Sequence, residues 1–199
     1  MIVKAADRTH VLLIRPGATD FDDQGRIKGC LDMPMSDSGR AQVSSMVEEL
    51  ADFELKTIFT APCESARETA DELAMRFARA GRGEVRVKVM DAFRNVDHGL
   101  WHGKLIDELR RNNPKIYRRG EETPDTIQPP GGESIVQAKH RAMKALQKLV
   151  KRSSGRVVAI VVPDPMGELI RNMLEGNEEL VNLWKYEIDH ARWDLVEDV

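Results

Sequence analysis

Apolar positions along the chain fall into two alternating patterns. Short runs rich in Val, Ile and Leu predict strands at His10–Ile14, Thr57–Thr60, Val85–Val89 and Arg156–Val162, with weaker ones at Lys185–Asp189 and Arg192–Glu197. Longer segments with helical spacing predict helices at Ser36–Ala51, Ser65–Ala80, Lys104–Tyr117, Ser134–Ser153 and Pro165–Leu174. This alternation is typical of a parallel sheet covered on both faces. We therefore expect a single α/β domain over residues 1–199, three-layered, with a mostly parallel sheet and helices on both faces.

Three predicted loops follow the carboxyl ends of predicted strands. They are Arg15–Gly17, Thr60–Cys63 and Val162–Pro165. In open parallel sheets this edge forms the ligand pocket, so the three loops are candidates for one site. The stretch Gly120–Gly132 is rich in Pro, Gly, Thr and Glu, and it is predicted to be a long loop able to overhang the same edge.

Composition narrows the class of protein. Hydrophobic residues make up 41% and charged residues 32%, which is typical of a globular protein rather than a disordered one. The net charge of −3 gives no reason to expect nucleic acid or an anionic membrane as a partner. Two cysteines do not make a disulfide framework and fit a reducing compartment. With no apolar leader in Met1–Arg8 and no apolar run longer than Val157–Val162, we expect a cytoplasmic protein.

A set of spaced motifs begins directly after the first predicted strand. Arg15-Pro16-Gly17 is followed by Gly25-Arg26-Ile27-Lys28-Gly29 and then by Asp32-Met33-Pro34. This layout resembles the N-terminal signature of the histidine phosphatase superfamily, the phosphoglycerate mutase-like proteins. In that family the residue between Arg and Gly is a nucleophilic histidine, whereas this chain has Pro16. A proline ring has no lone pair to attack phosphorus and no proton to shuttle.

Four further positions depart from what the resemblance implies. Ser65 stands where the family has a phosphate-clamping arginine, Asn95 where it has a general acid, and Asp22 where it has a phosphate-contacting asparagine. The loop that would carry the second histidine is Pro163–Gly167, with Asp164 in its centre and no histidine. Arg15 is the retained clamp. We therefore expect no catalytic residue at the degenerate positions, which are Pro16, Ser65, Asn95 and Asp164.

Two functions remain open. The departures favour a catalytically inactive histidine-phosphatase-like protein, a pseudophosphatase with a binding or regulatory role towards a protein or small molecule. The alternative is a phosphatase or phosphoglycerate mutase-like enzyme whose site is rebuilt without a phosphohistidine, using Arg15, Arg26, His98, His102 and water. The candidate pocket residues are Arg15, Gly17, Asp22, Arg26, His98 and His102.

The replaced positions also have structural interpretations. Ser65-Ala66-Arg67-Glu68 has the pattern of a capping box at a helix start. Asp164-Pro165 has the pattern of an N-cap followed by proline at the first helical position. Arg15 would face carboxylates at Asp22 and Asp164, so we expect weak phosphate binding and an internal ion pair between Arg15 and Asp22.

Metal binding is not expected from the sequence. His98 and His102 are four residues apart beside Asp97, but Gly99 and Gly103 favour a loop, and the sequence shows no third ligand nearby. Cys63 is interpreted as a small apolar residue, since its spacing to Arg67 is too short for a cysteine-phosphatase loop. We therefore predict neither a metal nor a cofactor.

Overall fold

A computed structural model describes residues 8–177, 184, 191–197 and 199. Its centre is a five-stranded sheet in the order β3-β2-β4-β1-β5. The strands are β1 (His10–Ile14), β2 (Thr57–Thr60), β3 (Arg86–Val89), β4 (Val157–Val161) and β5 (Trp193–Val196). β1, β2, β3 and β4 pair in parallel, and β5 runs antiparallel to β1 at one edge. The expected α/β fold with a mostly parallel sheet is confirmed.

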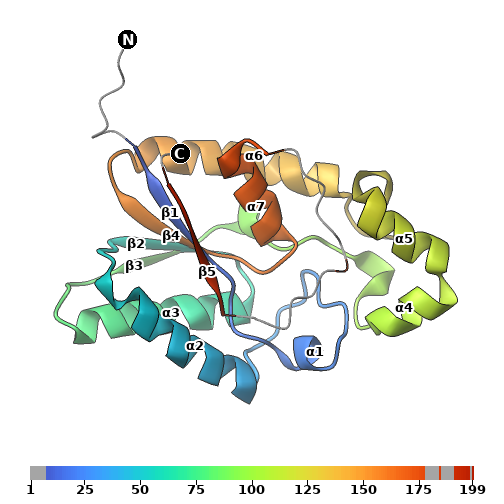
Figure 1. The fold of residues 1–199 in the computed structure, drawn as a ribbon, viewed down its shortest axis with the longest axis horizontal. Coiled ribbons are helices and arrows are strands. Elements are labelled where there is room, and N and C mark those ends of the chain that lie inside the picture. Colours follow the sequence, from blue (N-terminus) through green and yellow to red (C-terminus); the bar gives the residue numbers. More distant parts are fainter. Residues whose placement is uncertain (1–7, 178–183, 185–190, 198) are drawn as a thin grey trace, which may run out of the picture.

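Helices cover both faces of this sheet. Figure 1 shows α2 (Asp37–Glu49) and α3 (Glu64–Arg79) on one side and α6 (Ile135–Arg152) and α7 (Met166–Glu175) on the other. A short α1 (Asp20–Asp23), α4 (Ile106–Asn112) and α5 (Pro114–Glu122) lie beyond one end of the sheet (Figure 1). The three expected layers are therefore present.

Local sequence explains most helix starts. Ser36 accepts a hydrogen bond from the Gly39 backbone at the start of α2, and Ser134 forms a capping box with Gln137 at the start of α6. The single helix expected at Lys104–Tyr117 is wrong in one respect, because two helices are found. The first, α4, ends at Asn112, and the second, α5, begins at Pro114. The residue before a proline disfavours helical backbone, which accounts for the break.

The loop expected at Gly120–Gly132 is shorter than predicted. Its first residues complete α5, and Pro124–Thr126 form a 3-10 turn. Its end does approach the neighbouring segment, because the Leu100 amide donates to the Pro130 carbonyl at 2.9 Å. The strand expected at Lys185–Asp189 lies outside the described residues.

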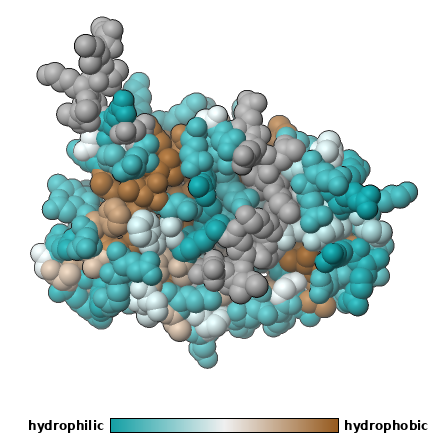
Figure 2. Space-filling view, in the orientation of Figure 1, coloured by the Kyte–Doolittle hydropathy of each residue, from teal (hydrophilic) through white to brown (hydrophobic). Residues whose placement is uncertain are grey.

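The core lies on both faces of the central strands. Val11 to Ile14 and Ala159 to Val162 have no exposed surface, which explains why these two runs lack polar residues. The face in Figure 2 is mostly hydrophilic, with one apolar area on its left below the end of α6. None of the described helices has the length and apolar character needed to cross a membrane.

Candidate functional site

The first candidate residue, Arg15, leaves the carboxyl end of β1 and lies almost sealed from solvent, with 3% of its surface exposed. Its Nε donates to Asp164 Oδ1 at 2.7 Å, and its Nη1 lies 3.5 Å from Asp194 Oδ2 on β5. Asp164 also faces Arg192, at 3.4 Å. The guanidinium thus faces two carboxylates from distant parts of the chain, which Arg192 and Arg171 share, and its Nη2 is buried without a hydrogen-bond partner among the described residues.

Close packing fixes this arrangement. A Cβ on Gly167, in the first turn of α7, would lie 2.5 Å from Arg15 Nε and 2.7 Å from Asp164 Oδ1, so only glycine leaves room for the pair. Gly17 is equally confined, since its Cβ would lie 2.6 Å from the Gly39 carbonyl. Pro16, between Arg15 and Gly17, is buried, and its carbonyl accepts from the Ala191 amide at 3.0 Å.

The acidic partner of Arg15 differs from the expected one. Arg15 pairs with Asp164, whereas Asp22 Oδ2 bonds Lys28 Nζ at 2.5 Å and the Thr19 amide at 2.8 Å. Arg15 therefore does form an internal ion pair, but with Asp164, so the prediction of Asp22 as its partner was wrong. Lys28 is 4% exposed and had no signal in the sequence that would set it apart as the partner of Asp22.

The Asp164 cap is only partly as predicted. Asp164 Oδ1 does accept from the Glu168 amide at 3.1 Å, as a residue capping a helix does. However, α7 begins at Met166, so Pro165 precedes the helix instead of opening it. One carboxylate thus caps a helix and neutralises Arg15.

Asn95, at the expected acid position, ties three backbone segments together. Its Nδ2 donates to the Asp164 carbonyl at 2.8 Å and to the Gly29 carbonyl at 3.1 Å. Its Oδ1 accepts from the Met166 amide at 3.2 Å. Asn95 is 4% exposed, and an ionised carboxylate there would have no hydrogen to donate to either carbonyl. The geometry suits an amide specifically.

The capping box predicted at Ser65 is wrong. α3 begins at Glu64, which places Ser65 inside the helix, with 1% of its surface exposed. The orphan amide at the helix start is that of Glu64, which donates to Asp32 Oδ1 at 2.5 Å. Glu68 accepts instead from the Met35 amide at 2.7 Å. The cap comes from a distant loop, which local sequence could not reveal.

Arg26 and His98 are both held by the backbone. Arg26 Nη1 donates to the Gly103 carbonyl at 2.7 Å. His98 is fully buried, with Nδ1 3.1 Å from the Val96 carbonyl and with its Nε2 lacking a partner among the described residues. Burial lowers the pKa of His98 to about 4, and its hydrogen bond to Val96 opposes that shift. His98 is therefore a neutral core residue at neutral pH.

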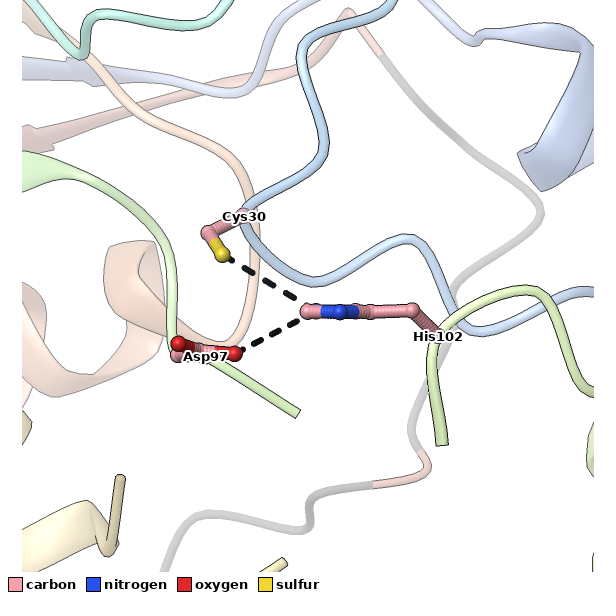
Figure 3. A group of neighbouring side chains, drawn as sticks. All are labelled: Cys30, Asp97 and His102. Carbon is pink, nitrogen blue, oxygen red and sulfur yellow. Dashed lines mark hydrogen bonds and ion pairs between the residues drawn. The ribbon is translucent and has the colours of Figure 1, made fainter. Parts of the chain in front are cut away.

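His102 belongs to a small cluster with Cys30 and Asp97. Figure 3 shows Cys30 and Asp97 converging on the His102 ring from two other segments. His102 Nε2 lies 3.9 Å from Cys30 Sγ and 3.7 Å from Asp97 Oδ1, and the three ligand atoms all lie within 4.8 Å of one another. The prediction that no third ligand lies near the histidines was wrong, because Cys30 is far away in the chain and only the fold brings it beside His102.

This cluster is compatible with a divalent metal such as zinc. Zinc bonds of about 2.0–2.3 Å separate tetrahedral ligands by about 3.3–3.6 Å, a few tenths of an ångström less than the distances here. The metal would compete with the His98 amide, which donates to His102 Nε2 at 3.2 Å. It would also have to deprotonate Cys30, because burial and the Asp97 charge raise the pKa of this thiol.

The predicted residues therefore form one connected region. Asn95 links the Arg15–Asp164 pair to Gly29, and a Cβ on Gly29 would lie 2.4 Å from His102 Nε2. Asp194, Lys28 and Cys30 complete this region and were missed, whereas Asp97 was noted only as a neighbour of the two histidines. Nothing in the local sequence marks these residues, and only the fold brings them together.

The comparisons with known proteins agree with this fold. A sequence model of the histidine phosphatase superfamily (branch 1) matches residues 11–197. Phosphoserine phosphatase 1 of Hydrogenobacter thermophilus is 27% identical over 187 residues, which cover 94% of this chain and 85% of that protein. Phosphoglycerate mutase-like protein 4 of Arabidopsis thaliana is 25% identical over 171 residues, 85% of this chain and 71% of that protein.

Solved structures give the same result. YhfR of Bacillus stearothermophilus is similar with a TM-score of 0.78 and 26% identity, over 94% of this chain and 90% of that one. A mycobacterial glucosyl-3-phosphoglycerate phosphatase, described in complex with VO3, has a TM-score of 0.77 and 25% identity, over 94% and 92% of the two chains. The family match spans nearly the whole chain, and the solved structures share its overall fold. The chain belongs to the histidine phosphatase superfamily.

Proposed function

We propose that this protein is a pseudophosphatase, a member of its family that has a binding or regulatory role and no phosphohistidine chemistry. The observation that carries the proposal is the state of Arg15, beside Pro16. The one clamp that the resemblance retains is sealed from solvent and already paired with Asp164 and Asp194.

Electrostatics oppose phosphate binding at this position. At an effective dielectric of about 20, two unit charges about 4 Å apart interact by about 4 kcal/mol. The attraction between Arg15 and a phosphate charge is therefore opposed by Asp164 and Asp194, although each of these carboxylates also pairs with a second arginine, Arg192 and Arg171 respectively. Two of the three guanidinium nitrogens, Nε and Nη1, are occupied by carboxylates, and only Nη2 has no hydrogen-bond partner among the described residues, so a dianionic phosphate would meet one donor instead of a bidentate fork.

The remaining chemistry is also missing from the positions that the family resemblance indicates. Pro16 has no nucleophilic atom, and Asn95 has no proton acidic enough to give to a leaving group. The Asn95 amide is fully engaged with the Asp164 and Gly29 carbonyls and the Met166 amide. These contacts support a structural use of a position that the family resemblance assigns to catalysis.

A phosphatase with a rebuilt site is the second candidate. The names of the relatives favour it, since they are phosphatases and mutase-like proteins, and nothing in those comparisons bears on inactivity. The Cys30–Asp97–His102 cluster is the specific feature that such an enzyme would use. Cys30, Asp97 and His102 would hold the metal, which would supply a bound water of lowered pKa as a nucleophile.

Turnover measurements separate the two candidates. We expect no hydrolysis of p-nitrophenyl phosphate or phosphoserine, with or without Zn²⁺, Mn²⁺ or Mg²⁺, while the Hydrogenobacter relative assayed in parallel serves as positive control. Activity that Arg15→Ala or His102→Gln abolishes would refute the proposal and establish the rebuilt enzyme. Activity retained in both variants would instead identify a contaminating phosphatase, which further purification would remove.

We further propose a cytoplasmic location, which the two free cysteines support. Fractionation of cells that express the tagged chain tests this proposal.

A further inference from the structure

A large groove lies away from the site described above, between α6 and the strands β2, β3 and β4. Its volume is about 890 Å³, within the range of functional ligand pockets. One wall is α6 from Arg141 to Ser153, and the other is formed by the sheet and by the segments that lead into β2 and β4. The groove therefore follows the helix for about three turns.

The floor of the groove is apolar although it is open. Side chains alternate along a strand, so Ile58 of β2 points to the face that α3 covers and Phe59 points into the groove. Ile58 is fully buried, whereas Phe59 is only partly buried. Partly exposed apolar surface also comes from Met90, Ala92, Ala145 and Val157, while Leu149 and Val158 lie beneath it with 4% of their surface exposed. Nothing among the described residues covers this surface.

The rim of the groove is strongly basic. Seven cationic residues line it against one acidic residue, Glu54, in a chain whose net charge is −3. Arg141 is paired with Glu133. The other six are exposed and have no ion-pair partner among the described residues; they are Lys56, Lys88, Lys144, Lys148, Arg152 and Arg156. Lys88 instead places its Nζ 5.8 Å from the centre of the Phe59 ring.

Several arginines elsewhere in the molecule are used in ion pairs. Arg40, Arg67 and Arg76, for example, each pair with a carboxylate even though they lie on exposed helices. Six cations around an apolar surface, with no ion-pair partner in the described part of the chain, repel one another, and an anionic partner relieves that repulsion. The charge and the floor together fit a partner that is both acidic and apolar.

The spacing of the cations defines the shape of this partner. Lys144, Lys148 and Arg152 form a row on α6 that extends over about 12 Å at 1.5 Å per residue. Lys56, Lys88 and Arg156 line the opposite wall. A single headgroup could contact only one end of such a row, so the partner must carry several acidic groups distributed along an apolar stripe.

We propose that the groove binds an acidic amphipathic helix of another protein. Three turns of helix, about 16 Å long and 10 Å wide, have a volume of about 1,250 Å³, and half of this is comparable with the groove. Its apolar face lies against Phe59 and Met90, and its Glu and Asp side chains reach the two basic walls. This mode places i, i+3, i+4 and i+7 apolar anchors in the groove.

This inference goes beyond the proposed function and does not depend on it. The groove and the Arg15–Asp164 region share no residue, and binding is measured without any reference to turnover. A pseudophosphatase would use such a surface for its binding role, but an active enzyme could carry it equally well.

Binding of designed peptides to the full chain tests the proposal. The probe is a fluorescein-labelled 18-residue peptide with Leu at helical spacing on one face and Glu on the other. The control peptide has the same composition with the Leu residues distributed around the helix. Fluorescence anisotropy should show the amphipathic peptide binding at least about tenfold more tightly, with an affinity that falls as NaCl rises from 50 to 500 mM.

Charge reversal on one helix locates the site. Lys144→Glu/Lys148→Glu should weaken binding by about tenfold or more, because two attractive contacts become repulsive. Lys139→Glu/Lys151→Glu makes the same change in net charge on α6 outside the groove and should alter affinity less than about twofold. Circular dichroism and thermal unfolding verify that both double variants fold.

Four results would overturn the proposal. They are absence of peptide binding, equal loss in the two double variants, equal binding of the control peptide, and tighter binding of a 12-nucleotide single strand of DNA. Sedimentation provides one more check, since a dimer that only Lys144→Glu/Lys148→Glu dissociates would show that a second copy of this chain occupies the groove.

Discussion

Replacing Asn95 by aspartate tests whether this position serves the fold rather than catalysis. The substitution preserves shape and removes both N–H donors, leaving the buried carbonyls of Asp164 and Gly29 without their partner at 2.8 and 3.1 Å. Each unsatisfied buried carbonyl costs about 1–3 kcal/mol, and the introduced charge adds repulsion with Asp164. We expect Asn95→Asp to lower the free energy of unfolding by about 3–5 kcal/mol at pH 7.

Urea unfolding followed by circular dichroism measures this loss. Asn113→Asp makes the same chemical change at an exposed position and should stay within about 0.5 kcal/mol of the original protein. If Asn95→Asp were as stable as the Asn113→Asp control, the three hydrogen bonds of the Asn95 amide would not be holding the site together. The structural interpretation of this position would then be refuted.

Four further predictions concern the pH response, the cluster and the missing chemistry. His98 has a folded pKa of about 4 against an unfolded value of 6.5, so the unfolded chain binds more protons and stability should fall by up to about 3 kcal/mol from pH 6.5 to 4. His98→Asn should flatten this slope in urea titrations and His140→Asn should not; parallel slopes would refute the burial argument. If the Cys30–Asp97–His102 cluster binds metal, Co²⁺ added to the protein should give a thiolate charge-transfer band. Cys30→Ser or His102→Gln should remove this band, and Cys63→Ser should retain it. Absence of the band in the original protein would exclude cobalt binding at the cluster. Incubation with a labelled phosphate donor should give no acid-labile phosphate, and a stoichiometric adduct on histidine would contradict the pseudophosphatase proposal. Pro16→His alone should give no measurable turnover, since catalytic groups that act as a unit are strongly non-additive; turnover would mean that the site is far more complete.

The inner strands were predictable because buried strands consist of short runs of apolar residues, which are visible in the sequence. β1 and β4 lie in the centre of the sheet and contain almost only apolar residues, so the sequence shows them directly. The single helix expected at Lys104–Tyr117 was wrong because spacing favoured continuity, while Pro114 forces the residue before it out of helical backbone.

The candidate site was predictable only in outline. The resemblance located Arg15, Asn95 and Asp164, and the structure connects these three residues. The resemblance could not show which acid pairs with Arg15. That choice depends on how α7 and β5 pack beside β1. The cap of α3 failed for the same reason, because Asp32 reaches Glu64 from a loop that only the tertiary fold brings near.

The basic groove between α6 and the sheet also could not be predicted from the sequence. Lys144, Lys148 and Arg152 are ordinary solvent-exposed residues of an amphipathic helix in the sequence. Their meaning changes only when α6 is placed above Phe59 and opposite Lys56 and Lys88. Charge patterning along one element could not have revealed a site that two walls create.

The affinity of the Arg15 region for phosphate tests the central claim most directly. Inorganic phosphate is titrated into the protein by calorimetry, with Arg15→Ala as the matched variant. Because Asp164 and Asp194 occupy Arg15 Nε and Nη1, we expect no binding tighter than about 1 mM and no difference between the two proteins. Low-micromolar binding that Arg15→Ala abolishes would show a working phosphate site and contradict the account.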